Sequence, residues 1–363
     1  MTEQDAMKRA IELGLRGSGA VSPNPRVGCV ILRDGQVIGE GWHEQYGGEH
    51  AEANAIANAG GNVEGATVVV TLEPCAHEGK QPPCADLLIR HKVACVVVGT
   101  TDPNPLVAGG GIAKLREAGI EVVTGILEEE CRWLCRFFIK HITSGEPYII
   151  AKIAQSFDGC ISTARGESKW ITGDDARRRV HAMRSEVDAV MIGRGTALSD
   201  DPELTTRDVD GAHPRRIVLD SHLSLPLSLK LFSDSYRNNT FVLCNKRAAQ
   251  SRKADSLRVA GVNIAAVDDN SDSSMNINAV VAYCGKEMGI TSMMVEGGSQ
   301  LLSSVVQHNL VDELHIFTAP ILIGDGKHSF SSLYSAALKD ARRFQTRALG
   351  LCGNDIHVIA TRV

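Results

Sequence analysis

The sequence predicts a two-domain α/β protein in which each domain is a sheet covered by helices. The chain has 363 residues, which at about 150 residues per domain gives room for two. Apolar runs of strand length alternate with helical patterns in both halves, and this alternation predicts sheets with helices on both faces. The segment "TSGEP", residues 143–147, interrupts the alternation. We therefore expect one domain over residues 1–145 and a second over residues 146–363.

The first half should alternate strands and helices around a hairpin. "VGCVILRDGQVIGEGWH" predicts two antiparallel strands with Asp34-Gly35 as their turn. Gly60-Gly61 should end the helix that starts at His50. We expect the other strands at 66–72, 94–100 and 120–126, and helices at 5–15, 50–59, 84–91, 111–118 and 128–142.

A second alternating set follows the linker. We expect strands at 148–154, 188–193, 215–220, 239–244, 290–298, 313–322 and 355–362, and helices at 174–186, 276–288 and 299–308. The polar run "DDNSDSS", residues 268–274, predicts a solvated loop.

Composition excludes several classes of protein. Hydrophobic residues make up 43% and charged residues 22% of the chain, as in soluble globular proteins. The net charge of −5 argues against binding to nucleic acid or an anionic membrane. No apolar run reaches the roughly 18 residues needed to cross a bilayer, and the first residues lack the basic and apolar segments of a signal peptide. We expect a cytoplasmic protein whose ten cysteines stay reduced, so metal binding, catalysis or packing is favoured over disulfides.

The stretch "TLEPCAHEGKQPPC" carries the strongest chemical pattern, together with "EHAEA" upstream. His50, Cys75 and Cys84 form a three-ligand set for one Zn²⁺ per chain, which leaves the fourth tetrahedral position for water. Zinc lowers the pKa of such a water towards neutrality. Glu52, two residues from a ligand, is the expected proton shuttle. The alternative is that the three ligands are unrelated buried residues.

The prolines of this stretch favour the interpretation of the two cysteines as metal ligands. Pro74 stiffens the chain after a strand and fixes the position of Cys75. Pro83 stands near a helix start, where a missing N–H costs little. Cys84 would then lie in the first helical turn, where the positive helix end favours the thiolate that binds metal.

The pattern H-x-E…P-C-x-x-C is the signature of zinc nucleobase deaminases, but here eight residues separate the two cysteines. Together with "SPNPRVGCV", "GWH" and "DPNP", the motifs resemble the deaminase half of the bifunctional riboflavin-biosynthesis deaminase/reductases. The resemblance runs through essentially the whole chain and implies a cytidine-deaminase-like three-layer domain. Its implied substrate is a diaminopyrimidinone with a ribosylamino 5′-phosphate, contacted by Asn24, His43, His77, Lys80, Asp102 and Asn104.

For several of these residues a purely structural role is the alternative. Asn24 in "PNP" and the stretch from Asp102 to Asn104 are plausible turns, and His43 could simply end a strand. Gln81 stands where the family has threonine, and Ala76 where serine is common.

The second half has a weaker signal in "MMVEGGSQLL". An apolar strand ends at Glu296, two glycines turn the chain, and a helix begins at Ser299. Backbone N–H groups at such a helix start bind phosphate. An ordinary strand–turn–helix junction is the alternative, since two glycines are fewer than a dinucleotide fingerprint has.

Polar residues around this junction are candidate contacts. Lys152 lies inside a predicted strand, which is costly unless the amine has a partner or a role. Arg184 and Arg207 could bind a substrate phosphate, although an exposed salt bridge is the commoner role of an arginine. Trp170 could pack or contact a ligand, and Asp201 could accept from a ribose hydroxyl or cap a turn.

"KWITG", "DDPELT" and "VEGGS" resemble the reductase half of the same family, whose fold is dihydrofolate-reductase-like. The resemblance implies NADPH along Ala154, Trp170, Thr196, Asp200, Ser221, Gly298, Ser299, Gln300, Leu301, Leu302, Ser303 and Ser304. It implies substrate contacts at Lys152, Ser168, Arg184, Leu204, Arg207 and Glu296. Cys160 stands where the family is expected to have a basic residue, so this sequence departs from the family pattern at one charge contact.

The remaining cysteines are expected to pack in the interior. Cys131 and Cys135 are four residues apart on a predicted helix and could form half of a metal site, but no partner pair follows. The other five are Cys29, Cys95, Cys244, Cys284 and Cys352.

We therefore expect an enzyme with two steps. Zinc-dependent hydrolysis removes an exocyclic amine, and NADPH then reduces the ribosyl group to a ribityl chain. A nucleic-acid deaminase and a non-enzymatic zinc scaffold are the alternatives; the acidic charge argues against the first and the three-ligand set against the second. We expect small-molecule partners, neither nucleic acid nor membrane, and a homo-oligomer (dimer or tetramer).

Overall fold

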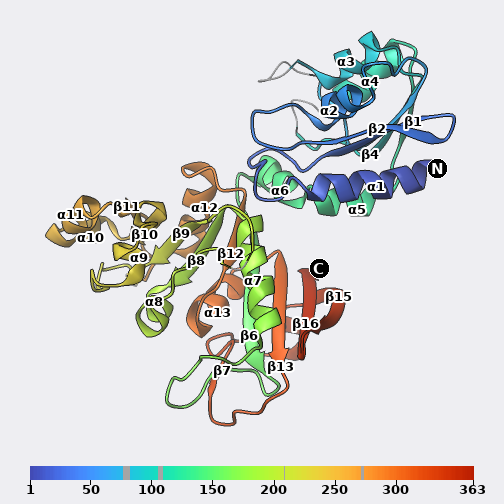
Figure 1. Ribbon diagram of the computed structural model, residues 1–363. Coiled ribbons are helices and arrows are strands. Elements are labelled where there is room, and N and C mark those ends of the chain that lie inside the picture. Colours follow the sequence, from blue (N-terminus) through green and yellow to red (C-terminus); the bar gives the residue numbers. More distant parts are fainter. Residues whose placement is uncertain (77–81, 105–108, 208, 271–273) are drawn as a thin grey trace. The chain divides into compact units, whose positions relative to one another are not determined.

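The chain divides into two compact units, Met1–Gly145 and Glu146–Val363. The computed structural model describes residues 1–76, 82–104, 109–207, 209–270 and 274–363 (Figure 1). Among the described helices, none is long and apolar enough to span a membrane.

The first unit is a sheet with helices on both faces, as predicted. Its five strands lie in the order β2-β1-β3-β4-β5. They are β1 (Gly28–Arg33), β2 (Gln36–Trp42), β3 (Thr67–Leu72), β4 (Cys95–Thr100) and β5 (Glu121–Thr124). β1 pairs antiparallel with β2 and β3, whereas β3, β4 and β5 are parallel. The predicted turn is confirmed, since Asp34 and Gly35 both have positive φ, at 51° and 72°.

Alternate residues of these strands face two separate cores, as the pleat requires. One core packs α2 (Ala51–Asn58), α3 (Cys84–Arg90) and α4 (Gly110–Glu117) against one sheet face. The other packs α1 (Glu3–Leu15) and α5 (Glu128–Leu134) against the opposite face. The helix predicted at 128–142 divides at Cys135 into α5 and α6 (Arg136–Ser144).

Glycines in β2 place α2 close to the sheet. A Cβ on Gly39 would lie 2.4 Å from the carbonyl oxygen of Ala55, and one on Gly41 would lie 2.3 Å from the Ala55 nitrogen. Alanines on the helix and glycines on the strand therefore allow a contact that larger residues would prevent. This contact fixes the helix that carries Glu52.

The second unit is built on a nine-stranded sheet in the order β11-β10-β9-β8-β12-β6-β13-β16-β15. The first seven strands of that order are parallel, and β16 and β15 complete the sheet as antiparallel strands. The strands are β6 (Tyr148–Ser156), β8 (Ala189–Gly193), β9 (Arg215–Leu219), β10 (Thr240–Cys244), β11 (Asn263–Ala266), β12 (Ser292–Val295), β13 (Glu313–Ala319), β15 (Phe344–Cys352) and β16 (Asp355–Arg362).

The helices α12 (Ile277–Lys286) and α13 (Ser299–Gln307) cover the main core of this sheet. The other helices are α7 (Asp174–Glu186), α8 (Arg194–Asp200), α9 (Lys230–Ser233), α10 (Lys246–Ala249) and α11 (Arg252–Val259), with short 3₁₀ turns at Arg237–Asn239 and Leu338–Asp340. A separate two-stranded sheet pairs β7 (Cys160–Ser162) with β14 (Lys327–His328). The elements α8 to α11, β7, β11, β14 and β15 are absent from the sequence prediction.

All ten cysteines are unpaired. Cys131 and Cys135 are buried core residues, and the Cys135 thiol donates to the Arg26 carbonyl at 3.2 Å. Cys29, Cys95, Cys244 and Cys284 are buried as predicted, while Cys352 is partly exposed.

Two candidate active sites

The predicted metal ligands meet in the first unit. His50 is the N-cap of α2, Cys75 follows β3, and Cys84 opens α3. Their donor atoms all lie within 4.8 Å of one another. His50 Nδ1 is 3.2 Å from Cys84 Sγ and 3.6 Å from Cys75 Sγ. Tetrahedral zinc with its usual Zn–N and Zn–S lengths would separate nitrogen from sulfur by about 3.6 Å, so the donor set fits zinc.

The peptide around Cys75 favours a thiolate. The backbone N–H of Cys84, at the start of α3, donates to Cys75 Sγ at 3.3 Å. Hydrogen bonding from Cys84 lowers the pKa of Cys75 to about 4, although burial opposes the shift. Since the thiolate is the form that binds metal, this site is prepared for a cation.

Glu52 lies in the first turn of α2, with its side chain in the wall of a cavity of about 290 Å³. The residue is 3% exposed, and burial raises the pKa of its carboxyl. A carboxyl group with a raised pKa beside a metal site is suited to accept and return a proton.

Asn24 and His43 line the same cavity and are joined to each other. His43 Nδ1 is 2.9 Å from the Glu49 carbonyl, and its Nε2 is 3.1 Å from the amide nitrogen of Asn24. Burial lowers the pKa of His43, which favours the neutral ring. Nδ1 then donates to Glu49 and Nε2 accepts from Asn24, so the orientation of the Asn24 amide is fixed. The His43 ring also contacts the ring of His50 edge-on, with centroids 5.4 Å apart.

Asp102 and Asn104 also line the cavity, on the segment after β4. Asp102 Oδ1 accepts from the Asn104 backbone N–H at 2.9 Å, which is the turn chemistry considered above. The structure therefore joins this turn to the cavity wall. The remaining predicted contacts of this site, His77 and Lys80, lie outside the described residues, as does Gln81.

Glu73 is a cavity residue that the sequence analysis missed. Its buried carboxylate accepts four backbone N–H groups, from Asp102, Gly109, Gly111 and Ile112, at 3.0–3.2 Å. It thereby ties the strand end before Cys75 to the Asp102 turn and to the start of α4. The signal was its place in "TLEPC", because an acid directly after an apolar strand needs partners when it is buried.

A second cavity, of about 890 Å³, lies in the second unit. Twelve of the residues predicted to contact cofactor or substrate line this cavity: Lys152, Ala154, Ser168, Trp170, Arg184, Thr196, Asp200, Leu204, Arg207, Glu296, Gly298 and Leu302. Other residues predicted to contact cofactor lie outside this lining: Ser221, Ser299, Gln300, Leu301, Ser303 and Ser304. The thiol of Cys160 is buried and contacts the Gly324 carbonyl at 3.5 Å.

An ion pair forms part of the lining of this cavity. Arg184 donates from Nε and Nη2 to the two carboxylate oxygens of Glu296, at 2.6 and 2.9 Å, and both side chains are about nine-tenths buried. Burial raises the pKa of Glu296, but the charge and hydrogen bonds of Arg184 outweigh it, so the net shift is downward. Lys152 lies near both groups, and desolvation lowers its pKa. The guanidinium fork of Arg184 is therefore already bound to a carboxylate.

Hydrogen bonds to neighbouring segments fix the glycine turn before α13 and the first residues of that helix. The N–H of Gly298 donates to Thr196 Oγ1 at 2.9 Å. The hydroxyl groups of Ser299 and Ser303 accept from the N–H groups of Ser331 and Ser332, at 2.8 and 3.3 Å. These two serine side chains therefore contact other parts of the protein, and Gly297, Gly298 and Leu302 are the residues of the turn and of α13 that line the cavity.

His181, on α7, is a second residue that the sequence analysis missed. It lines the cavity, and the backbone N–H of Arg207 donates to its Nδ1 at 3.1 Å. Burial, with the nearby charges of Arg184 and Arg207, lowers the pKa of His181. Its position one helical turn before Arg184 was the available signal.

Comparisons with known proteins cover both units. The family model for the cytidine and deoxycytidylate deaminase zinc-binding region matches residues 1–100, and the RibD C-terminal domain model matches residues 147–358. The chain is 40% identical to riboflavin biosynthesis protein RibD of Actinobacillus pleuropneumoniae over 98% of this chain and 94% of the relative. It is 38% identical to RibD of Aquifex aeolicus over 99% and 98%.

Solved structures give the same result. RibD of Acinetobacter baumannii, form 1, matches with a TM-score of 0.89 and 37% identity over 99% of both chains. A diaminohydroxyphosphoribosylaminopyrimidine deaminase/5-amino-6-(5-phosphoribosylamino)uracil reductase from Thermotoga maritima matches with a TM-score of 0.88 and 38% identity over 99% of both chains. The predicted combination of a deaminase-like and a reductase-like fold is confirmed.

Proposed function

The chain belongs to the RibD family of bifunctional deaminase/reductase enzymes of riboflavin biosynthesis, and from this premise we propose how its two units divide the reactions. The unit Met1–Gly145 deaminates 2,5-diamino-6-(5-phosphoribosylamino)pyrimidin-4(3H)-one by hydrolysis. The unit Glu146–Val363 reduces the ribosyl group of the resulting 5-amino-6-(5-phosphoribosylamino)uracil to ribityl with NADPH. The metal donors and buried carboxyl of one cavity, and the Lys–Arg–Glu cluster of the other, support this division.

In the deaminase site, His50, Cys75 and Cys84 would hold one zinc ion, which supplies a Lewis acid that activates water. Glu52 takes a proton from the attacking water and delivers it to the leaving amine, so a C–O bond forms, a C–N bond breaks and ammonia leaves. Asn24, held by His43, presents a fixed amide to the pyrimidine. Asp102 and Asn104, together with His77 and Lys80, complete the contacts proposed for the substrate.

Removal of zinc is the direct test of the deaminase assignment. We expect the rate of ammonia release by chelator-treated enzyme to fall at least about 100-fold, because the metal stabilises the transition state by several kcal/mol. Added zinc should restore the rate, and NADPH oxidation with the uracil substrate should not change. Metal-free enzyme that deaminates at the full rate would contradict the assignment. Cobalt replacement offers a separate readout, since thiolate ligands give a charge-transfer absorption band.

In the reductase site, bound NADPH would supply a hydride for C1′ of the opened sugar imine, and a proton on the imine nitrogen would complete the ribityl amine. Ala154, Trp170, Thr196, Asp200, Ser221 and the segment 298–304 are proposed to hold the cofactor. Ser168, Leu204 and Arg207 are proposed to hold the substrate, while Lys152, Arg184 and Glu296 orient the polar groups at C1′. The choice of NADPH over NADH is part of the proposal.

Arg207→Ala tests the phosphate contact. We expect the KM for the phosphorylated substrate of the reductase to rise about 10- to 100-fold, because a hydrogen bond to a charged group contributes about 1.5–3 kcal/mol. Arg258→Ala is the matched control: Arg258 is 45% exposed and paired with Asp255, as Arg207 is 47% exposed and paired with Glu203. Equal KM values for the two variants in NADPH oxidation assays would rule out the contact.

We propose a homo-oligomer, a dimer or tetramer, in the cytoplasm. The exposed edge strand β15, with Leu349 71% and Leu351 77% exposed, supports association. Ten unpaired cysteines agree with a reducing compartment. Light scattering of the purified chain gives the oligomeric state.

A further inference from the structure

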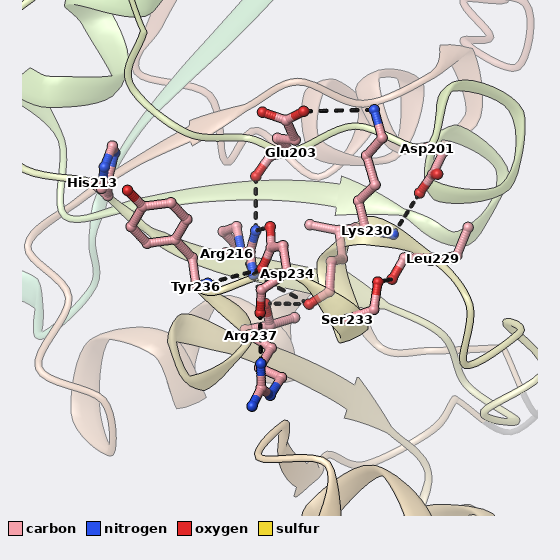
Figure 2. Close-up of polar contacts among 12 residues, drawn as sticks. Asp201, Glu203, His213, Arg216, Leu229, Lys230, Ser233, Asp234, Tyr236 and Arg237 are labelled. Atoms are coloured by element: carbon pink, nitrogen blue, oxygen red, sulfur yellow. Dashed lines mark hydrogen bonds and ion pairs between the residues drawn. The ribbon is translucent and has the colours of Figure 1, made fainter.

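Among the residues that the structure describes, Arg216 is the largest fully buried side chain, at 1% exposed. It stands on β9, and its neighbour Ile217 faces the main core, so the pleat directs Arg216 to the opposite face. Figure 2 shows its guanidinium beside Asp234 and the Glu203 backbone. The side chain lies outside the lining of the reductase cavity.

Every N–H of this guanidinium has an acceptor. Two bonds, at 2.6 and 2.8 Å, go to the two carboxylate oxygens of Asp234. Nε donates to Thr240 Oγ1 at 2.9 Å, and Nη2 also donates to the Leu231 carbonyl at 3.2 Å. The fifth bond runs from Nη1 to the Glu203 carbonyl at 3.0 Å. Since a guanidinium offers five donors in a fixed plane, these partners define one position for the group.

The Glu203 carbonyl belongs to a segment in an unusual conformation. Asp201 and Leu204 both have positive φ, at 41° and 53°. Residues other than glycine rarely adopt this conformation, and it persists where the surroundings hold it. Glu203 lies between the two, so the bond from Arg216 acts at the centre of the strained stretch.

The same neighbourhood holds the segment at two further points. The N–H of Lys230 donates to Asp201 Oδ1 at 2.8 Å. The N–H of Thr206 donates to His213 Nδ1 at 3.1 Å, and the His213 ring packs edge-on against Tyr236, with centroids 4.4 Å apart (Figure 2). The N–H of Tyr236 in turn donates to Asp234 at 3.0 Å. Asp234 thus supports the segment through Arg216 and through Tyr236.

The segment contributes five residues to the lining of the reductase cavity, and two of them are the proposed substrate contacts. Leu204 and Arg207 both line it, on either side of the stretch that His213 contacts. We infer that Arg216 is a positioning residue of the reductase, which sets the conformation of the segment from Asp201 to Arg207 through the Glu203 carbonyl. This inference rests on the proposed function, in which Leu204 and Arg207 contact the substrate.

Arg216→Lys tests the inference, because lysine keeps the charge but loses the planar fork. We expect the KM of the reductase for its phosphorylated substrate to rise about 10-fold, the loss expected for a displaced charged contact. The KM for NADPH should stay within about twofold of the parent value, because Leu204 and Arg207 are proposed to contact the substrate and not the cofactor. Deaminase activity, from the other unit of the same chain, should not change. Partial unfolding alone would lower the apparent kcat and leave both KM values as they were.

Val218→Ala is the matched control, since Val218 lies two residues along β9 on the same sheet face and is fully buried. It should lower stability without raising the substrate KM. If Arg216→Lys does not fold, Asp234→Asn weakens the same cluster and should raise the same KM. A substrate KM equal to that of Val218→Ala, in whichever of the two cluster variants folds, would overturn the positioning role. Arg207→Ala decides the substrate contact separately, so the two failures can be told apart.

Discussion

Replacing Glu52 with glutamine is expected to lower the kcat of deamination by about 100- to 10,000-fold, the usual contribution of a positioned acid–base group. Glutamine has nearly the same shape, so the cavity wall and α2 should be kept. The amide cannot take a proton from water or return it to the leaving amine. The measurement is ammonia release at saturating pyrimidine substrate, with zinc content determined on the same sample.

Two controls make this result specific. Glu49→Gln changes the exposed glutamate on the other side of His50, and its deamination rate should stay near that of the parent. NADPH oxidation by the second unit should be the same in both variants. A Glu52→Gln enzyme that still holds zinc and releases ammonia at the parent rate would remove Glu52 from the mechanism.

The close approach of His50, Cys75 and Cys84 could be predicted because each of them carries a local signal. His50 and Cys84 stand at helix starts, and Cys75 follows an apolar strand and a proline. Three such residues at the ends of neighbouring elements of an α/β pattern meet at one edge of the sheet. The α/β class followed from the same alternation of strands and helices, whereas the deaminase-like and reductase-like folds were expected from the resemblance of the motifs. The comparisons confirm these folds for both units.

The features that could not be predicted from the sequence depend on partners that are far away along the chain. Glu73 receives N–H groups from residues 29 to 39 positions away, and nothing local to "TLEPC" names them. The strand β15 has exposed residues along most of its length, so it lacks the apolar alternation that predicts a strand. Arg216 follows another arginine and precedes the apolar part of β9, and its acceptors become visible only when β10 and the turn at Asp234 lie beside it.

Replacing Glu296 with glutamine should have the largest effect in the second unit. Removing one partner of a buried ion pair costs about 3–5 kcal/mol, because the other charge stays buried without compensation. Arg184 would keep one acceptor oxygen and face an amide NH₂ in place of the other. For a unit of this size the loss corresponds to a fall of about 6–20 °C in the unfolding midpoint. Reductase turnover should fall as well, since Glu296 and Lys152 line the same cavity.

Heat inactivation of the two activities in one chain measures how far Glu296→Gln lowers the stability of the second unit. The reductase activity of Glu296→Gln should disappear at a lower temperature, while the deaminase activity should survive as in the parent. Glu186→Gln is the control, because it breaks the more exposed pair of Arg179 with Glu186 on α7, at 2.8 Å. An exposed pair contributes at most about 1 kcal/mol, so this variant should lose little.

A double variant separates stability from chemistry. Arg184→Met with Glu296→Leu replaces both charges by apolar groups, a change that is often neutral or stabilising for a buried pair. Its resistance to heat should therefore return towards that of the parent, whereas NADPH oxidation should stay lost because the carboxylate beside Lys152 is gone. Recovery of both properties in the double variant would mean that the pair only holds the fold and takes no part in the reduction.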